Sequence, residues 1–151
     1  MIKKIIMWSL VVLWMGVIFF FSSYNGLDSE EQSRGFLYHT LGNLIEFFDK
    51  DISYEQKEEL IIKYDPIVRK IAHVSVFFIL TILVCLALNQ HNLDIKRIIL
   101  YSSIICILYA CSDEIHQLFV SDRSGKVLDV LIDSIGICFA NLLFYLRRKN
   151  D

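Results

Sequence analysis

The sequence lacks the motifs of the common hydrolytic and metal-binding sites. No H-E-x-x-H pattern is present, and no serine or cysteine stands in a pattern that would activate it as a nucleophile. The four cysteines lie in apolar stretches without C-x-x-C spacing, which argues against disulfides and a cysteine metal site. Internal repeats and low-complexity segments are also absent. We expect no metal, no cofactor and no nucleic-acid partner.

The sequence has long apolar stretches instead. Hydrophobic residues make up 55% of the 151 residues and the mean hydropathy is +0.49, more apolar than is usual for a soluble domain. Each stretch is close to the ~20 residues that cross a bilayer. No small-residue cleavage site follows the first, so we interpret it as a membrane span and not as a signal peptide. We predict an all-α, polytopic membrane protein, a single domain over residues 1–151, with spans at 5–21, 69–88, 98–119 and 127–146.

Basic residues predict the orientation of these spans. Lys3-Lys4 precede the first span, Lys96-Arg97 lie between the second and third, and Arg147-Arg148-Lys149 follow the fourth. An even number of spans puts these three sites on one side, which the positive-inside rule makes cytoplasmic. We therefore expect a multi-pass protein of the bacterial cell membrane with both termini in the cytoplasm.

The loop over residues 22–66, expected outside, has the pattern of two short amphipathic helices. Capping boxes begin at Ser29 and at Ser53, and apolar residues at helical spacing follow each of them. The second stretch is expected to stop before Pro66, since a proline disfavours helical backbone in the residue before it. Such helices could cover the bundle, rest among the lipid headgroups or gate access to a site.

Ionisable residues gather near the outer ends of the last three spans. At 1.5 Å per residue, His73, Asp113 and Asp133 lie roughly 20–22 Å from the cytoplasmic ends of their spans. Ionisable groups at such a depth are costly and mark functional sites by default. The candidate ligand-binding residues are Arg69, Lys70, His73, Glu114, Gln117, Arg123 and Asp129, and the candidate catalytic residues are Asp113, His116 and Asp133.

Spacing puts these groups on common helix faces. Arg69 and His73 are four residues apart, as are Asp129 and Asp133, so each pair projects from one side of a helix. Three helices can thus direct polar faces into one outward-facing cavity. Gly136 and Ala140 offer a seam of small residues for close helix approach in the fourth span.

Three interpretations of this constellation remain open. The charges can form a structural ion network, because charges in a low-dielectric region need partners. The cations can bind a phosphate or carboxylate headgroup at the outer leaflet, for which the forked guanidinium is suited. A proton or ion path is the third interpretation, but the cytoplasmic halves of the spans contain almost no ionisable groups that would complete it.

The order of these pieces resembles the VanZ-like family of small bacterial membrane proteins. The matching strings are Phe21-Ser22-Ser23, Arg69-Lys70-Ile71-Ala72-His73, Tyr109 to Gln117, Arg123, and Asp129 to Gly136. Many members carry an acid three residues after the histidine, where Val76 stands here. The resemblance implies an integral membrane protein that lowers susceptibility to teicoplanin and related lipoglycopeptides. It does not supply a chemical mechanism.

Three functions compete on this basis. The protein could bind membrane lipids or a lipid-linked cell-wall precursor in the cavity through Arg69, Lys70 and Arg123. It could be a hydrolase or transferase acting on an envelope lipid or polymer, with Asp113, His116 and Asp133 as acid and base. A metal-assisted form of this enzyme, with a divalent metal held by carboxylates and histidine, is the weaker version, because no known ligand motif is present. It could also serve as a structural or partner-binding membrane protein, and a homo-oligomer is left open.

Overall fold

The part of the chain that the structure describes folds into four long helices and one short helix. The computed structural model describes residues 1–24, 26, 31, 33–40 and 53–150. A short helix over residues 33–40 lies in the first loop. The long helices are α1 (Ile2–Ser22), α3 (Tyr54–Asn89), α4 (Ile95–Gln117) and α5 (Val127–Asn150), and all four are long and apolar enough to cross a membrane. The predicted all-α fold with four spans is confirmed.

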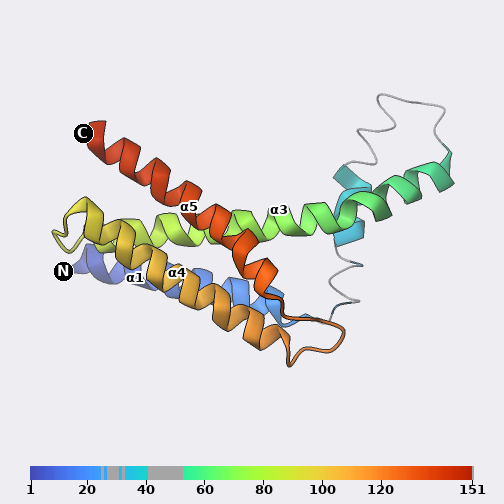
Figure 1. The fold of residues 1–151 in the computed structure, drawn as a ribbon, viewed down its shortest axis with the longest axis horizontal. Coiled ribbons are helices and arrows are strands. Elements are labelled where there is room, and N and C mark those ends of the chain that lie inside the picture. The colour runs from blue at the N-terminus through green and yellow to red at the C-terminus, as the bar shows by residue number, and fades with distance from the viewer. Residues whose placement is uncertain (25, 27–30, 32, 41–52, 151) are drawn as a thin grey trace.

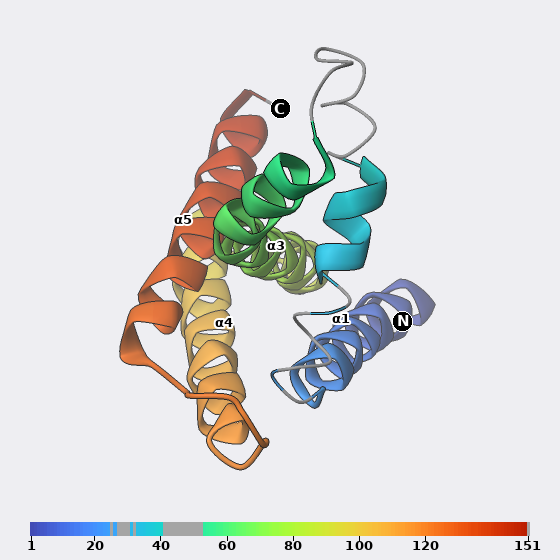
Figure 2. The same cartoon turned by 90° about the vertical axis from the view of Figure 1, so that its right-hand side faces the viewer.

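The four long helices form a bundle centred on α3. Seen from one end, α3 lies between α1 on one side and α4 and α5 on the other, and it packs against all three (Figure 2). Both chain ends and the α3–α4 connection lie at the same end of the bundle (Figure 1). We call this the basic end, because it carries Lys3, Lys96 and Arg148. The opposite end, with the connection between α4 and α5, is called the polar end.

Helix α3 is longer than a membrane span. Its 36 residues extend about 54 Å at 1.5 Å per residue, against ~30 Å for a hydrocarbon core. The first part therefore projects beyond the polar end of the bundle, beside the short helix (Figure 1). The predicted capping box is present, because the Gln56 N–H donates to Ser53 Oγ and the Ser53 N–H donates to Gln56 Oε1.

The prediction that this helix ends before Pro66 is wrong. Proline removes one backbone hydrogen bond from a helix interior, yet α3 continues through Pro66. Arg69 pairs with Asp65 across the proline at 3.4 Å, and Asp65 also accepts a hydrogen bond from Ser33 of the short helix. The second surface helix is thus the first part of α3 and not a separate element.

The short helix packs on this projecting part of α3. Leu37 of the short helix and Ile61 of α3 are both buried, at 1% and 3% exposed, and the Lys57 ammonium lies over the Tyr38 ring at 4.7 Å. These contacts join the first loop to α3. Most of the first predicted capping box and the apolar residues that follow Thr40 lie outside the described residues.

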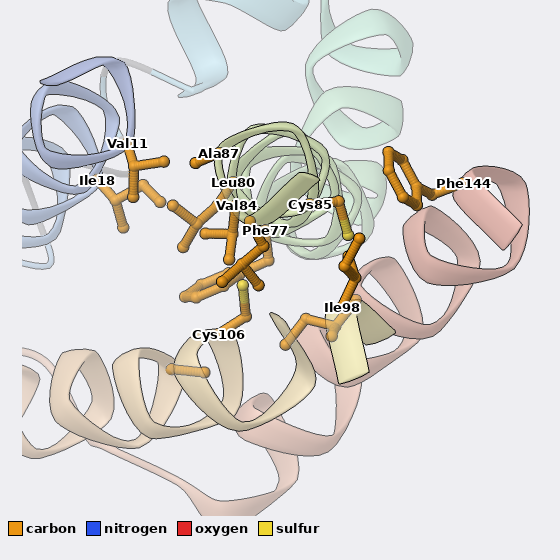
Figure 3. Packing of buried hydrophobic residues seen from close by; sticks show 13 residues of the cluster. Val11, Ile18, Phe77, Leu80, Val84, Cys85, Ala87, Ile98, Cys106 and Phe144 are labelled. Atoms are coloured by element: carbon orange, nitrogen blue, oxygen red, sulfur yellow. The ribbon is translucent and has the colours of Figure 1, made fainter. Parts of the chain in front are cut away.

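An apolar core fills the centre of the bundle. Phe77, Leu80 and Val84 of α3 are fully buried and pack between α1 and α4 (Figure 3). Two further hydrogen bonds fasten α1 to this core, since Trp14 donates to the Val76 carbonyl at 3.0 Å and Tyr109 donates to the Met15 carbonyl at 2.6 Å. The outward faces of the helices are apolar and exposed, as expected for helices surrounded by lipid.

A glycine sets the closest approach between α3 and α5. A Cβ added at Gly136 would collide with the carbonyl oxygen of Val74 and lie 3.2 Å from the Phe78 nitrogen. Ala140, one turn later, is fully buried. The predicted seam of small residues is therefore where the two backbones meet. The crossing also brings His73, beside Val74, close to Asp133, one turn before Gly136.

Candidate functional site

Polar side chains meet at the polar end of the bundle. We call the following residues the polar cluster: Ser22, His73, Asp113, Glu114, Gln117, Arg123, Asp129 and Asp133. They come from α1, α3, α4, α5 and the connection between α4 and α5. The predicted convergence of polar faces from the last three spans is thus seen in the structure, with the end of α1 added.

Gln117 joins α4 to α1. Its side-chain nitrogen donates to Ser22 Oγ at 3.0 Å and to Asp113 Oδ2 at 3.0 Å. All three residues are buried, with 3–6% exposed. Asp113 and Gln117 are four residues apart, so one helical face presents both the amide and the carboxylate.

His73 and Asp133 face each other between α3 and α5. The His73 Nδ1 and Asp133 Oδ1 atoms are 3.8 Å apart, which is beyond the usual range of a direct hydrogen bond. Asp133 is 1% exposed, whereas His73 is half-buried. The pair therefore lies close enough for electrostatic attraction but does not form a direct hydrogen bond.

Several buried atoms of the cluster lack hydrogen-bond partners. Within the part of the chain that the structure describes, these atoms are His73 Nδ1, Asp113 Oδ1 and both carboxylate oxygens of Asp133. Folded proteins pair the great majority of their buried polar atoms, so such a concentration of exceptions calls for an explanation.

Glu114 holds the connection between α4 and α5. Its Oε2 atom accepts a hydrogen bond of 2.8 Å from the backbone N–H of Lys126. Gly125 fits directly against the end of α4, because an added Cβ would collide with the Glu114 carbonyl oxygen. Glu114 thus holds the connection against the end of α4.

Arg123 extends from this connection over the cluster. One terminal nitrogen, Nη2, donates to the Phe21 carbonyl of α1 at 3.4 Å, a long hydrogen bond. The guanidinium is half-buried, and burial lowers its pKa, while the nearby carboxylate of Asp113 raises it. Because a guanidinium has five N–H donors, most of its hydrogen-bonding capacity is not used by this contact.

Two of the predicted cations lie at the margin of the cluster. Arg69 pairs with Asp65 on the projecting part of α3, and its charge also reaches His73 and Arg123. Lys70, the next residue, is exposed. The charge of Arg123, by contrast, interacts with those of Asp113 and Glu114 in the cluster.

His116 is directed toward α1 and away from Asp133. Its Nε2 atom is 3.1 Å from Ser23 Oγ, and its ring stacks on Phe19 with 4.3 Å between ring centroids. Ser23 donates its hydroxyl hydrogen to the Phe19 carbonyl at 2.7 Å. The hydroxyl thus acts as the acceptor toward His116, which is not the arrangement of a serine activated by a histidine base.

Asp129 lies in the first turn of α5 and is half-buried. Its charge acts on His73, Glu114 and Asp133. Four carboxylates, those of Asp113, Glu114, Asp129 and Asp133, are therefore gathered within electrostatic reach of one another. Their side chains do not form a group of three or more ligands that could hold a metal ion among the described residues.

The two best-formed hollows of the described structure lie away from the polar cluster. One, of about 640 Å³, follows the exposed side of α1 beside Lys4, Trp8 and Leu13. The other, of about 360 Å³, lies beside Ile95 and Tyr145 at the basic end. Because the deepest members of the cluster are covered by protein, an outward-facing cavity there stays a prediction.

A second polar network, which was not predicted from the sequence, lies in the other half of the bundle. Asn141 of α5 accepts hydrogen bonds from Ser102 Oγ at 2.7 Å and from Cys85 Sγ at 3.3 Å. Its amide donates to Ser103 Oγ at 2.9 Å. All four groups are uncharged and satisfied, so this network joins α3, α4 and α5 and needs no ligand. The one signal in the sequence was an asparagine within an apolar span.

Comparison with known proteins identifies one family. A family model described as VanZ/LLP1 matches residues 7–148, nearly the whole chain. No protein with a curated description and no solved structure matched the chain. The matched region includes every member of the polar cluster.

Proposed function

The chain belongs to the VanZ/LLP1 family, and on that premise we propose that it lowers susceptibility to teicoplanin and related lipoglycopeptides. It does so by binding an outer-leaflet lipid, or a lipid-linked component of the envelope, at the polar cluster. The protein sits in the bacterial cell membrane with the basic end in the cytoplasm, in accord with the positive-inside rule. The polar cluster then lies near the outer headgroups.

The observation that carries this proposal is the position of Arg123. Its guanidinium is half-buried over the cluster and makes one long hydrogen bond, to the Phe21 carbonyl. A guanidinium with donors to spare is suited to forked contact with a phosphate. Arg69 and Lys70 lie at the margin, where they add positive charge along the route to the site.

A lipid ligand explains how a small membrane protein would act selectively on lipoglycopeptides. Teicoplanin carries an acyl chain and associates with the membrane, so it meets the outer leaflet where the polar cluster would lie. A protein that holds a lipid headgroup there would compete with the drug at the outer leaflet. Vancomycin has no such acyl chain, so we expect protection to be stronger against teicoplanin.

Acid–base catalysis by Asp113, His116 and Asp133 has less support. His116 lies against Ser23 and Phe19, whereas Asp133 lies beside His73. A purely structural role leaves the unpaired oxygens of Asp133 without an explanation. Binding accounts for both the cation over the cluster and the unpaired acceptors beneath it.

The test is the susceptibility of a sensitive Gram-positive host to teicoplanin and vancomycin. The host expresses wild type, Arg123→Gln or Arg97→Gln at matched membrane levels. Arg97→Gln is the matched control, because Arg97 is exposed at the basic end and pairs with Asp94 at 3.0 Å. We expect wild type and Arg97→Gln to protect against teicoplanin, and Arg123→Gln to lose that protection.

Two outcomes would contradict the proposal. Equal protection by wild type and Arg123→Gln would show that the guanidinium plays no part in it. If wild type gives no protection, this protein does not have the activity for which its family is named. Purified wild type would then be examined for co-purifying lipid, which binding at the polar cluster requires in either case.

A further inference from the structure

The buried centre of the polar cluster holds acceptors without matching donors. Among the described residues, Asp133 has two carboxylate oxygens without a hydrogen-bond partner and is 1% exposed. Asp113 has one such oxygen and is 3% exposed, and the His73 Nδ1 atom is also without a partner. Burying acceptors in this way carries a desolvation penalty that the fold does not recover by itself.

Two nearby donors are already engaged. The Gln117 side-chain nitrogen donates to both Ser22 and Asp113, which uses its two hydrogens. The Lys126 backbone N–H donates to Glu114. The Arg123 guanidinium has N–H donors to spare, and the proposed function assigns these to the phosphate.

The unpaired atoms are arranged for a shared donor from outside. The 3.8 Å between His73 Nδ1 and Asp133 Oδ1 is too long for a direct hydrogen bond. One ammonium group beside both atoms could donate to each of them, and one hydroxyl could donate to Asp133 Oδ1 while it accepts from a protonated His73 Nδ1. The third residue, Asp113, comes from α4, so the acceptors come from three different helices. A ligand that supplies donors at this point would bind all three helices at once.

We propose that the headgroup bound at the polar cluster carries a hydroxyl or an ammonium group beside its phosphate. This inference rests on the proposed function. The phosphate contacts Arg123, and the donor group contacts Asp133, His73 and Asp113. A bare phosphate monoester satisfies the guanidinium but leaves the buried carboxylates unpaired, so it binds more weakly.

The test compares three lipids with identical acyl chains on the purified full-length protein. Phosphatidic acid has a bare phosphate, phosphatidylglycerol adds hydroxyls, and phosphatidylethanolamine adds an ammonium group. Binding is measured by native mass spectrometry and by competition in nanodiscs. We expect wild type to prefer one of the two extended headgroups over phosphatidic acid by on the order of tenfold, because only they satisfy the buried acceptors. Which of them is preferred distinguishes hydroxyl from ammonium.

Variants separate the two parts of the site. Asp133→Asn and Asp113→Asn keep the side-chain size but replace one acceptor oxygen by a donor, so we expect each to lose the preference. Arg123→Gln should weaken all three lipids while the preference remains. Asp94→Asn, at an exposed position of the basic end, is the matched control and should behave as wild type. Helical content and elution volume identify any variant that fails to fold, and either asparagine variant suffices alone.

Distinct results would overturn the two proposals. Equal binding of the three lipids by wild type, or an unchanged preference in Asp133→Asn and Asp113→Asn, would mean that only water or a proton occupies the buried acceptors. In that case Arg123→Gln would still weaken binding if the proposed function is correct. If Arg123→Gln binds every lipid as wild type does, the proposed function itself fails.

Discussion

Replacing Gly136 by alanine should loosen the pairing of α3 with α5. The added Cβ would collide with the Val74 carbonyl oxygen and lie 3.1 Å from the Val74 carbonyl carbon. Both atoms belong to the backbone, so no side chain can turn away to make room. Helix α5 would have to move outward by on the order of 1 Å to restore ordinary contact distances.

The magnitude follows from two opposing effects. Overpacking a close-packed contact costs about 1–3 kcal/mol. Alanine in place of glycine within a helix returns about 0.5–1 kcal/mol. Gly136→Ala should therefore lower the free energy of unfolding by about 1–2 kcal/mol. Gly16→Ala is the matched control, because a Cβ at Gly16 meets nothing within 4 Å and only the favourable effect remains.

The assay is unfolding of the purified protein in mixed micelles, followed by helical content as the fraction of denaturing detergent rises. We expect Gly16→Ala to be at least as stable as wild type and Gly136→Ala to be clearly less stable. If Gly136→Ala proves as stable as Gly16→Ala, the close approach of α3 and α5 at this glycine is not present in the folded protein.

Three further predictions address other parts of the bundle. Asn141→Leu removes three hydrogen bonds, each worth about 0.6 kcal/mol in membrane proteins. Unfolding in mixed micelles should therefore show a free energy of unfolding lower by about 1–2 kcal/mol. Leu142→Ala, on the exposed face, should show little loss. Glu114→Ala should increase tryptic cleavage of the connection between α4 and α5 several-fold. Glu114→Gln keeps an acceptor oxygen for the Lys126 N–H, so it should increase cleavage less. Equal cleavage rates in the two variants would refute the role of Glu114 in holding the connection. In a background without the native cysteines, Ser124→Cys should react with a membrane-impermeant thiol reagent on whole cells and Lys149→Cys should not, and the reverse result would invert the proposed orientation.

Short sequence patterns were sufficient to predict the features that depend on neighbouring residues of one helix. Apolar length predicted the four helices. The Ser53 capping box and the small-residue contact at Gly136 also follow from short sequence patterns, and both are present. Each of these depends on residues within one or two turns of each other.

The features that escaped prediction depend on contacts between distant segments. Pro66 alone predicts a helix stop, but α3 continues through it, and Asp65 beside it contacts Ser33 of the short helix and Arg69. Likewise, the sequence could not show that His73 would lie beside Asp133 while His116 turns toward Ser23. Such pairings follow from how α1 and α5 are rotated, and periodicity within one helix does not determine that rotation.

The tight helix crossing at Gly136 and the unpaired acceptors of the polar cluster are structurally linked. Close contact at Gly136 fixes α5 against α3, which keeps Asp133 near His73. A fold that holds buried acceptors rigidly without donors is less stable than it would be with them satisfied. A ligand that binds only the folded state raises the free energy of unfolding. The increase grows with the logarithm of the ligand concentration relative to its dissociation constant. The preferred headgroup should therefore raise the resistance of wild type to denaturing detergent, and the same lipid should raise that of Asp133→Asn less, because the acceptors that the lipid would satisfy are no longer all present.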